Sequence, residues 1–590
     1  MINVKINNLK KSTSPYLQQH HDNPINWQEW SQEVLNYAKD HNKIILVSVG
    51  YATCHWCHVM AREAFSDKEI AEFLNEHFVC IKVDKEQRPD IDRFMMAFIQ
   101  ETQGHGGWPL NVFLTPEIKP LLAVTYVPVE SKHGLPKFID VISGVKEFFD
   151  QKKDQVQKFI PSDSHEETIE EMEIIQSIKH NHLHPGPQFP PHNTLLFLLS
   201  YYEKNQDEDL KEIIENLLDV IAKRGLHDHL QGGFYRYCVD EEWTIPHFEK
   251  MLYDQSMLLW VYSVAYKILK KPLYHTIIEK IVICLDETFF NHLYFSAHDA
   301  DTNHHEGITY VWDKEELEQN LTESEYKQFQ ELYLIEKNFE GKIHLIKKNN
   351  HFIPKIEEKL LHIRKLREQP FTDQKFVTSW NALIGISFIQ AYRSSRNEEY
   401  KFKAISLFKN LLEKHYENGI LHHSSHKGQL QLGEFLEDYA AMLLFVTYIY
   451  EETGEYKEIV KKFNKKLHGF KQEGWIESKT SDFLQIQAST FDHPSPSSSS
   501  LAEMAQLRAS IILEEEYDPT EYKSPFHHDF FNLMVFIKNG NWHIIHSPEN
   551  IDWNLLPANC IQIRSDKTQD CYNLKCHEFK DIKELLESLK

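Results

Sequence analysis

Hydrophobic positions follow one pattern in the first quarter of the 590-residue chain and a different one in the remainder. The first quarter contains short, nearly continuous apolar runs, rich in β-branched side chains, that are typical of strands buried on both faces. These runs are residues 43–49, 78–83, 110–114 and 123–127. Segments with helical spacing alternate with them at residues 27–41, 90–102 and 137–152. The alternation predicts an α/β domain over residues 1–155.

From residue 184 to about residue 515, apolar positions recur with helical spacing, and the helices come in pairs joined by long loops. The predicted helices are residues 193–204, 208–223, 249–269, 274–289, 379–392, 399–415, 435–451, 456–467 and 501–514. No short period repeats, so the pairs predict an all-α toroid of hairpins around a central pocket rather than a tight solenoid. An acidic stretch over residues 156–183 is interpreted as a linker or an exposed helix between the two regions.

The last segment, residues 516–590, returns to short apolar runs and is predicted to be a small α/β extension. The predicted strands are residues 533–537, 542–545 and 561–563, and the predicted terminal helix is residues 581–590. Cys571 and Cys576 lie here with four residues between them. Two interpretations stay open for this pair: exchange with the N-terminal cysteines, or two thiols without a redox role.

Charge narrows the classes of partner. The formal net charge is −24, and basic residues form no run longer than a short helical face, whereas nucleic-acid binders carry basic patches. The N-terminus has no apolar signal segment, and no stretch approaches 18 uninterrupted apolar residues. We therefore expect a soluble, cytoplasmic protein without a nucleic-acid or membrane partner. Eight cysteines are too few for a disulfide scaffold.

Two of those cysteines form a Cys-x-x-Cys motif between the first predicted strand and a helix. A thiol at a helix N-terminus meets unpaired N–H groups and the positive end of the helix dipole, which favours the thiolate. Cys54 is therefore the predicted attacking thiol and Cys57 the resolving one. The order of strands and helices, with Pro109 just before a strand, is that of a thioredoxin fold. We predict a cis Trp108-Pro109 bond beside the dithiol.

Other interpretations of this motif remain open. Cys-x-x-Cys-His is also the attachment motif of haem c, although such attachment occurs in exported proteins. A zinc site needs about four ligands, and His55, His58 and His105 could add to the two cysteines. The domain could also keep its fold and have lost its function. Our expectation is a redox dithiol with no resident cofactor or metal.

The loops between the predicted toroid helices are dense in His, carboxylate and aromatic residues. Such residues suit a sugar, because ring faces stack on aromatic side chains, carboxylates accept hydrogen bonds from hydroxyls, and His or carboxyl groups move protons. The candidates are His227, His229, Arg236, His247, Glu249, Tyr253, Asp254, Asp299, Asp301, Trp380, Asn381 and Asp438. Structural alternatives exist: the Asp299/Asp301 pair fits a capped turn. His247 and Asp254 would share one face if both were helical, and fit a buried hydrogen bond.

Several longer motifs carry a resemblance to a known family. These are "SPYLQQHHDNPINW", "CHWCHVM", "GHGGWPLNVFLTP", "HDHLQGGFYRYCVDEEWTIPHFEKMLYDQ", "YFSAHDADTNHHEGITYVW", "SWNALI" and "EDYA". Through them nearly the whole chain resembles the spermatogenesis-associated protein 20 family. The resemblance implies a thioredoxin-like domain followed by an (α/α)6 barrel, similar to six-hairpin glycosidases and N-acylglucosamine 2-epimerases. It also implies that a C-terminal cysteine pair is common in the family.

The chain departs from the family pattern at a few positions. Gln188 replaces a usual Lys, Gln231 a usual Gly, Tyr235 a usual His, and Ser499 a usual Asn. His105 stands where the family has a smaller or amide residue. The changes at Tyr235 and Ser499 are expected to reduce the polar lining of the barrel pocket.

Three functions follow from these patterns. The first is a thiol–disulfide oxidoreductase whose barrel binds a carbohydrate or an unknown redox partner protein. The second is a sugar-active isomerase, epimerase or hydrolase, with a regulatory or structural thioredoxin-like domain. The third is a non-catalytic, redox-sensing scaffold.

Overall fold

A five-stranded sheet forms the centre of the N-terminal domain in the computed structural model, which describes residues 3–132, 134–161, 169–181, 186–431, 433–517 and 527–589. The strand order is β1-β3-β2-β4-β5. The strands are β1 (Gln28–Glu29), β2 (Ile44–Gly50), β3 (Phe78–Asp84), β4 (Leu110–Leu114) and β5 (Pro120–Val124). β1, β3 and β2 are parallel, whereas β4 and β5 run antiparallel to their neighbours. The predicted thioredoxin-like domain is confirmed.

Both faces of this sheet are covered by helices, which explains the continuous apolar runs of β2 and β3. The helices are α1 (Pro15–Gln18), α2 (Gln32–Asp40), α3 (His55–Arg62), α4 (Lys68–His77), α5 (Pro89–Gln103) and α6 (Phe138–Lys152). Ile45 and Val47 face a core shared with α2 and α5, and Ile44 and Leu46 face a core shared with α3, α4 and α6. β5 lies three residues earlier than predicted.

Six helices of the described chain contact one another in a closed ring. They are α8 (His192–Asn205), α10 (Leu252–Leu269), α15 (Thr378–Ser395), α17 (Leu436–Thr453), α19 (Ser498–Leu513) and α20 (Asp529–Phe536). Helices of a second layer pack against the ring, and they are α9 (Glu208–Lys223), α11 (Pro272–Cys284), α16 (Glu398–His415) and α18 (Lys457–His468). This arrangement is the predicted (α/α)6 barrel.

The final ring helix corrects one prediction. The run at residues 533–537 was predicted as a strand, but these residues belong to α20 and the short π-helical segment after it. α20 is buried on every side, and an apolar run of that kind does not distinguish a buried strand from a buried helix. We therefore propose that the barrel extends beyond residue 515, to the end of α20.

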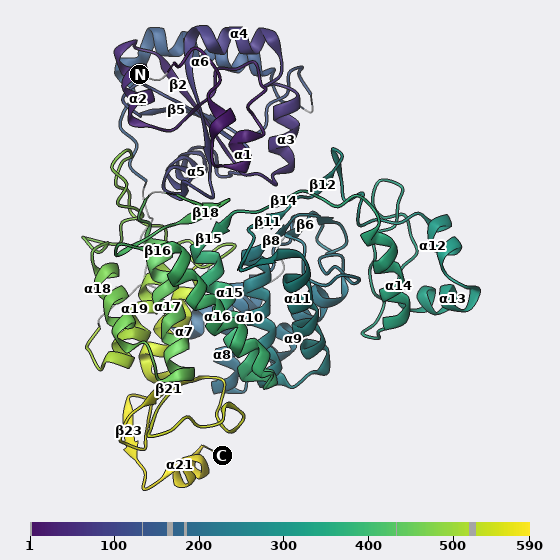
Figure 1. Cartoon of the computed structure of the whole chain (residues 1–590), viewed down its shortest axis with the longest axis vertical. Coiled ribbons are helices and arrows are strands. Elements are labelled where there is room, and N and C mark those ends of the chain that lie inside the picture. The colour runs from purple at the N-terminus through teal and green to yellow at the C-terminus, as the bar shows by residue number, and fades with distance from the viewer. Residues whose placement is uncertain are drawn as a thin grey trace.

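Three helices that the sequence pattern did not predict form an insertion with a small hydrophobic core of its own. They are α12 (Lys314–Asn320), α13 (Glu323–Leu332) and α14 (Pro354–Lys365), and they project from the side of the barrel (Figure 1). The predicted linker contains α7 (Glu171–Asn181), whereas residues 162–168 and 182–185 of it lie outside the described residues.

Short strands line one end of the ring. They are β6 (Tyr237–Cys238), β7 (Pro246–His247), β8 (Lys250–Met251), β9 (Phe290–Asn291), β10 (Leu293–Tyr294), β11 (Ala297–His298), β12 (Asp301–Thr302), β13 (His305–Glu306), β14 (Thr372–Asp373), β15 (Phe376–Val377), β16 (Tyr416–Glu417), β17 (Ile420–Leu421), β18 (Ser424–His426) and β19 (Gln429–Leu430). Figure 1 shows the thioredoxin-like domain above the end of the barrel that carries β8, β11, β14, β15 and β18. The junction between the domains is therefore at the barrel mouth.

The C-terminal sheet lies at the opposite end of the molecule (Figure 1). Its order is β21-β20-β22-β23, followed by a terminal helix. The elements are β20 (His543–Ser547), β21 (Cys560–Arg564), β22 (Gln569–Tyr572), β23 (Lys575–Glu578) and α21 (Ile582–Ser588). Within the described residues, no helix has the length and apolar character needed to cross a membrane.

Candidate active site at the domain junction

The Cys-x-x-Cys motif lies where β2 passes into α3. Cys54 is the N-cap residue of α3, and the backbone N–H of Cys57 donates to Cys54 Sγ over 3.2 Å. The two sulfurs form a disulfide. Gly50 is required at the end of β2, because a Cβ there would come within 2.7 Å of Cys57 Sγ. The local chain thus places both sulfurs at a helix N-terminus, as predicted.

The cis-proline prediction is also confirmed. The Trp108-Pro109 bond is cis. Val49 of β2 pairs with Leu110 of β4 in the sheet register, so Pro109 sits beside the end of β2 from which the cysteine turn departs. The dithiol and the cis-proline therefore have the relative order in the sheet that a thioredoxin-like site requires.

Barrel residues share one hydrophobic core with this disulfide. Cys54 is only 3% exposed and Cys57 only 1% exposed. Thr53 Oγ1, one residue before the motif, donates to Glu249 Oε1 over 2.8 Å. Glu249 is fully buried and also forms an ion pair with Arg236 over 3.0 Å. The barrel mouth and the dithiol therefore form one structural unit.

Two histidines of the motif pair with two barrel aspartates. His55 Nδ1 lies 2.7 Å from Asp301 Oδ1, and His58 Nε2 lies 3.0 Å from Asp299 Oδ2. Burial opposes the charged form of His55, but the hydrogen bond to Asp301 prevails and raises the pKa of His55 above its ordinary value. Burial likewise opposes ionisation of Asp301, and the His55 hydrogen bond prevails and lowers its pKa. Both shifts favour the ionised form of the His55–Asp301 pair.

These pairs change two interpretations. The proposed zinc ligands His55 and His58 are engaged with carboxylates from the other domain, whereas His105 lies on the exposed turn after α5. Asp299 and Asp301 do form a local turn, since Asp299 Oδ1 accepts from the Asp301 backbone N–H over 3.0 Å. Asp299 Oδ2 and Asp301 Oδ1 nevertheless contact the thioredoxin-like domain.

His247 and Asp254 would share a helical face only if both were helical, and His247 is not. His247 lies in β7, before α10 begins at Leu252, because it pairs in a strand with the 237–238 segment. His247 Nδ1 instead meets Glu306 Oε1 at 2.5 Å. Burial lowers the pKa of His247, but the Glu306 hydrogen bond outweighs it and the net shift is upward. The His247 ring is 6.4 Å from that of His55.

Asp254 belongs to a second group, deeper at the N-terminal ends of the ring helices. Its Oδ1 lies 3.7 Å from His192 Nε2, at the start of α8. Burial raises the pKa of Asp254 well above its ordinary value and lowers that of His192 to about 4. Burial therefore disfavours the charged form of both side chains. Three polar atoms of this group are buried without a hydrogen-bond partner: His192 Nε2, Tyr253 Oη and Asp254 Oδ2.

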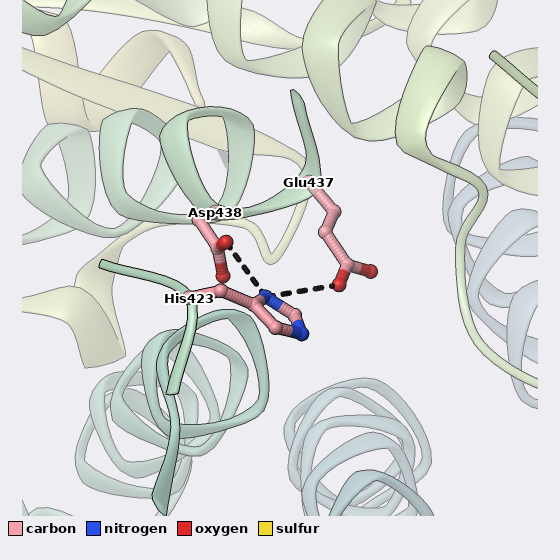
Figure 2. Close-up of side chains that lie close together, drawn as sticks. All are labelled: His423, Glu437 and Asp438. Atoms are coloured by element: carbon pink, nitrogen blue, oxygen red, sulfur yellow. Dashed lines mark hydrogen bonds and ion pairs between the residues drawn. The ribbon is translucent and has the colours of Figure 1, made fainter. Parts of the chain in front are cut away.

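A third cluster lies where β18 meets the start of α17 (Figure 2). His423 Nδ1 is 2.8 Å from Asp438 Oδ2 and 3.5 Å from Glu437 Oε1. His423 Nε2 faces the backbone carbonyl of Glu86, which follows β3, at 3.0 Å. Burial opposes protonation, yet the charge of Asp438 raises the pKa of His423 to about 9. This cluster therefore ties the barrel to the thioredoxin-like domain.

The same cluster has the residue types of a metal site. Within the described residues, His423, Glu437 and Asp438 are the group whose ligand atoms all lie within 4.8 Å of one another. The geometry is equally that of a protonated imidazole between two carboxylates, because His423 Nδ1 is already within hydrogen-bond distance of Asp438. We assign it this structural role.

Three of the predicted barrel residues, His227, His229 and Asn381, make side-chain contacts within the barrel. His227 and His229 are buried against each other, with their Nδ1 atoms 3.1 Å apart, and burial lowers both pKa values well below the ordinary value. Asn381 holds the backbone of Tyr294 through its side-chain amide. Trp380 packs edge-on against Tyr253 with ring centroids 5.0 Å apart, beside the Asp254 group.

Sequence reasoning missed several residues at the junction. The residues that form hydrogen bonds or ion pairs in these groups are Tyr51, Thr53, Glu86, His192, Glu306, Lys375, His423 and Glu437. Lys375 is fully buried and meets three carboxylates. They are Asp84 (at 2.5 Å), Glu86 (at 3.1 Å) and Asp373 (at 3.1 Å). Its neighbours in the sequence, Gln374 and Phe376, gave no local signal that this lysine is buried.

The departures from the family pattern have local explanations. Tyr235 is buried, and its ring packs edge-on against Phe248 and Tyr310. Ser499 is buried near the start of α19, where its hydroxyl donates to the Ala488 carbonyl over 3.2 Å. Neither side chain belongs to the groups around Glu249 or Asp254.

Comparisons with known proteins follow this division of the chain. Residues 6–170 match the family model Thioredox_DsbH, described as a protein of unknown function, DUF255. A cellobiose 2-epimerase from Spirochaeta thermophila is 10% identical over 60% of this chain and 88% of its own, with a TM-score of 0.38. That likeness is too low to support an argument, so the barrel assignment depends on the ring of helices.

Two relatives are closer in sequence. The uncharacterized protein B0495.5 of Caenorhabditis elegans is 31% identical over 86% of this chain and 81% of its own length. Spermatogenesis-associated protein 20 of Mus musculus is 35% identical over 54% of this chain, a match that spans 45% of the mouse protein. The chain therefore belongs to the spermatogenesis-associated protein 20 family.

Proposed function

We propose that this protein is a thiol–disulfide oxidoreductase whose dithiol works at the junction with the barrel. One observation supports this most directly: Cys54 caps the N-terminus of α3 with Cys57 one turn further, in a thioredoxin-like domain with a cis-proline beside the motif. A helix N-terminus stabilises a thiolate through its unpaired N–H groups, here including that of Cys57.

The reaction starts from the reduced protein. The Cys54 thiolate attacks one sulfur of a substrate disulfide, so a mixed disulfide forms and one substrate thiolate leaves. Cys57 loses its proton and attacks Cys54 Sγ, which breaks the mixed disulfide and releases the second substrate thiolate. Two electrons pass to the substrate, and the protein is left with the Cys54–Cys57 disulfide that the structure contains.

The barrel mouth has a defined place in this proposal. Glu249 and Asp301 hold residues on both sides of Cys54, namely Thr53 and His55. The charged His55 adds a cation next to the attacking thiol, and a neighbouring cation favours the thiolate. The barrel thus positions the motif and controls which molecules reach it, and the partner or carbohydrate that engages the barrel would bind at this junction.

The test is the disulfide reductase activity of the purified chain, with a disulfide-bonded peptide as substrate and reduced glutathione as electron donor. Cys54→Ser is expected to abolish turnover, and Cys57→Ser is expected to accumulate a mixed disulfide, while Cys80→Ser, a buried free cysteine, serves as the matched control. Wild-type protein that fails to reduce any disulfide, with Cys54 unreactive toward alkylating agents, would leave the redox-sensing or scaffold alternative.

A second function is favoured by the Asp254 group. Asp254 and His192 lie 3.7 Å apart, and burial raises the pKa of the carboxyl group and lowers that of the imidazole, an arrangement suited to proton transfer. With the unpartnered hydroxyl of the neighbouring Tyr253, this group suits a small polyhydroxy ligand. Calorimetric titration with monosaccharides tests this, because Asp254→Asn should weaken any binding, whereas Asp313→Asn, in the insertion, should not.

A further inference from the structure

We propose that the C-terminal disulfide Cys571–Cys576 is a second thiol–disulfide exchange site, and that its partner is a separate dithiol protein of thioredoxin-like fold. The two cysteines are directly opposite each other in the β22–β23 hairpin and are joined by a disulfide. Exposure separates this pair from the N-terminal one, because all four residues of β23, Cys576 included, are exposed. Both sulfurs of the Cys-x-x-Cys motif are, in contrast, buried beneath the barrel mouth.

A purely structural role is a poor explanation of this bridge. A disulfide restrains the unfolded chain least when the loop that it closes is short, and here only four residues lie between the two cysteines. The hairpin is already held without the bridge, since Asn573 and Leu574 both have positive φ, the backbone conformation of the tightest hairpin turns. The turn is also anchored, because the backbone N–H of Asn573 donates to the Gly540 carbonyl over 2.8 Å. The fold therefore does not require the bond to stay closed.

The surroundings of the pair match the way thioredoxin-like proteins bind. β23 is the edge strand of its sheet, so its outer row of backbone N–H and C=O groups faces away from β22. An extended edge strand is recognised by pairing with the backbone of another protein, and the side chains on it then define the target. Cys576 on such a strand presents its sulfur to an incoming thiolate.

The donor is a separate molecule. Figure 1 places the C-terminal sheet and the thioredoxin-like domain at opposite ends of the chain, so Cys54 does not reach this hairpin within one molecule. The Cys54 of a second copy is only 3% exposed, so it reaches such a hairpin only after its own domain junction opens. An external dithiol protein has neither restriction.

The partner's two thiols reduce the Cys571–Cys576 disulfide in two steps. The partner's thiolate attacks Cys576 Sγ, the Cys571–Cys576 bond breaks, and Cys571 leaves as a thiolate. The partner's second thiol then attacks the mixed disulfide and releases the Cys576 thiolate. The partner ends as a disulfide, and this chain gains two electrons and a reduced hairpin.

The first experiment measures which disulfide opens first. The oxidised full chain is mixed with reduced thioredoxin, quenched with iodoacetamide at intervals, and mapped by mass spectrometry. Alkylation of Cys571 and Cys576 at least tenfold faster than that of Cys54 and Cys57 is expected. A hairpin pair that stays oxidised while the N-terminal pair is reduced would overturn the proposal. Equal reduction of the hairpin by glutathione and by thioredoxin at matched thiol concentration would overturn the assignment to a dithiol partner.

The second experiment captures the intermediate. A thioredoxin that keeps only its attacking cysteine should form a covalent complex with the oxidised chain, mapped to Cys576. The Cys54→Ser/Cys57→Ser variant should still be captured, which separates this site from the oxidoreductase proposal, and Cys571→Ser/Cys576→Ser should not. Capture lost in the first variant and kept in the second would assign the exchange to the N-terminal motif and refute the inference.

Discussion

Breaking the ion pair between His55 and Asp301 should expose the buried disulfide. The chosen change is Asp301→Asn, which keeps the shape of the side chain and removes its charge. The His55–Asp301 contact is 2.7 Å long, with the side chains 18% and 7% exposed, so it is a charge-assisted hydrogen bond largely shielded from water. If Cys54 is reached only when such junction contacts open, the rate of its reduction reports how often they open.

The size of the effect follows from the contact. A hydrogen bond to a charged group contributes about 1.5–3 kcal/mol, and 1.36 kcal/mol corresponds to about a tenfold change in an equilibrium constant. The open population should therefore rise by about 10- to 150-fold. The rate of reduction rises in proportion, provided that reclosing is faster than reaction with the reductant.

The assay is reduction by dithiothreitol, followed by alkylation and peptide mapping. Cys571–Cys576, far from the junction, is an internal clock whose rate should not change. Asp313→Asn is the matched control, because it removes an aspartate that pairs with Lys342 in the insertion. Reduction of Cys54–Cys57 at the same rate in the wild type and in Asp301→Asn would refute the idea that the barrel limits access.

Three further predictions concern the junction and the ring. Lys375→Met should lower stability by about 3–5 kcal/mol, because it leaves buried carboxylates without their cation, and chemical denaturation would show it; an unchanged midpoint would contradict the charge assignment. The raised pKa of His423, about 9 against 6.5, stabilises the protein fully below pH 6.5, and this contribution is lost as pH rises through 9. Accordingly, the stability difference between wild type and His423→Gln should shrink by up to about 3 kcal/mol from pH 6.5 to 9.5, whereas a constant difference would exclude this ionisation. Asp254→Asn should leave the reduction rate of the Cys54–Cys57 disulfide within about twofold, since Asp254 has no contact with that motif; a large loss would mean that the two groups act together.

The sequence determined the elements whose signals are local. The apolar runs of β2 and β3 exist because helices cover both faces of the sheet, and that burial requires the same residue types whatever else the chain does. The position of Cys54 at a helix start and the cis bond before Pro109 follow from neighbouring residues. Most ring helices were predicted within a few residues for the same reason, since an amphipathic or buried helix is written in consecutive turns.

Only the tertiary structure decided which side chains meet. His55 and Asp301 are 246 residues apart in the chain. Each of them lies in a sequence that looks like an ordinary loop or helix end, so neither one indicates the other. Whether α20 is a strand or a helix was decided by closure of the ring, because an apolar run fits both. The covering of the dithiol likewise comes from the seating of one domain on the other, and contacts of that kind depend on the docked surfaces rather than on any local pattern.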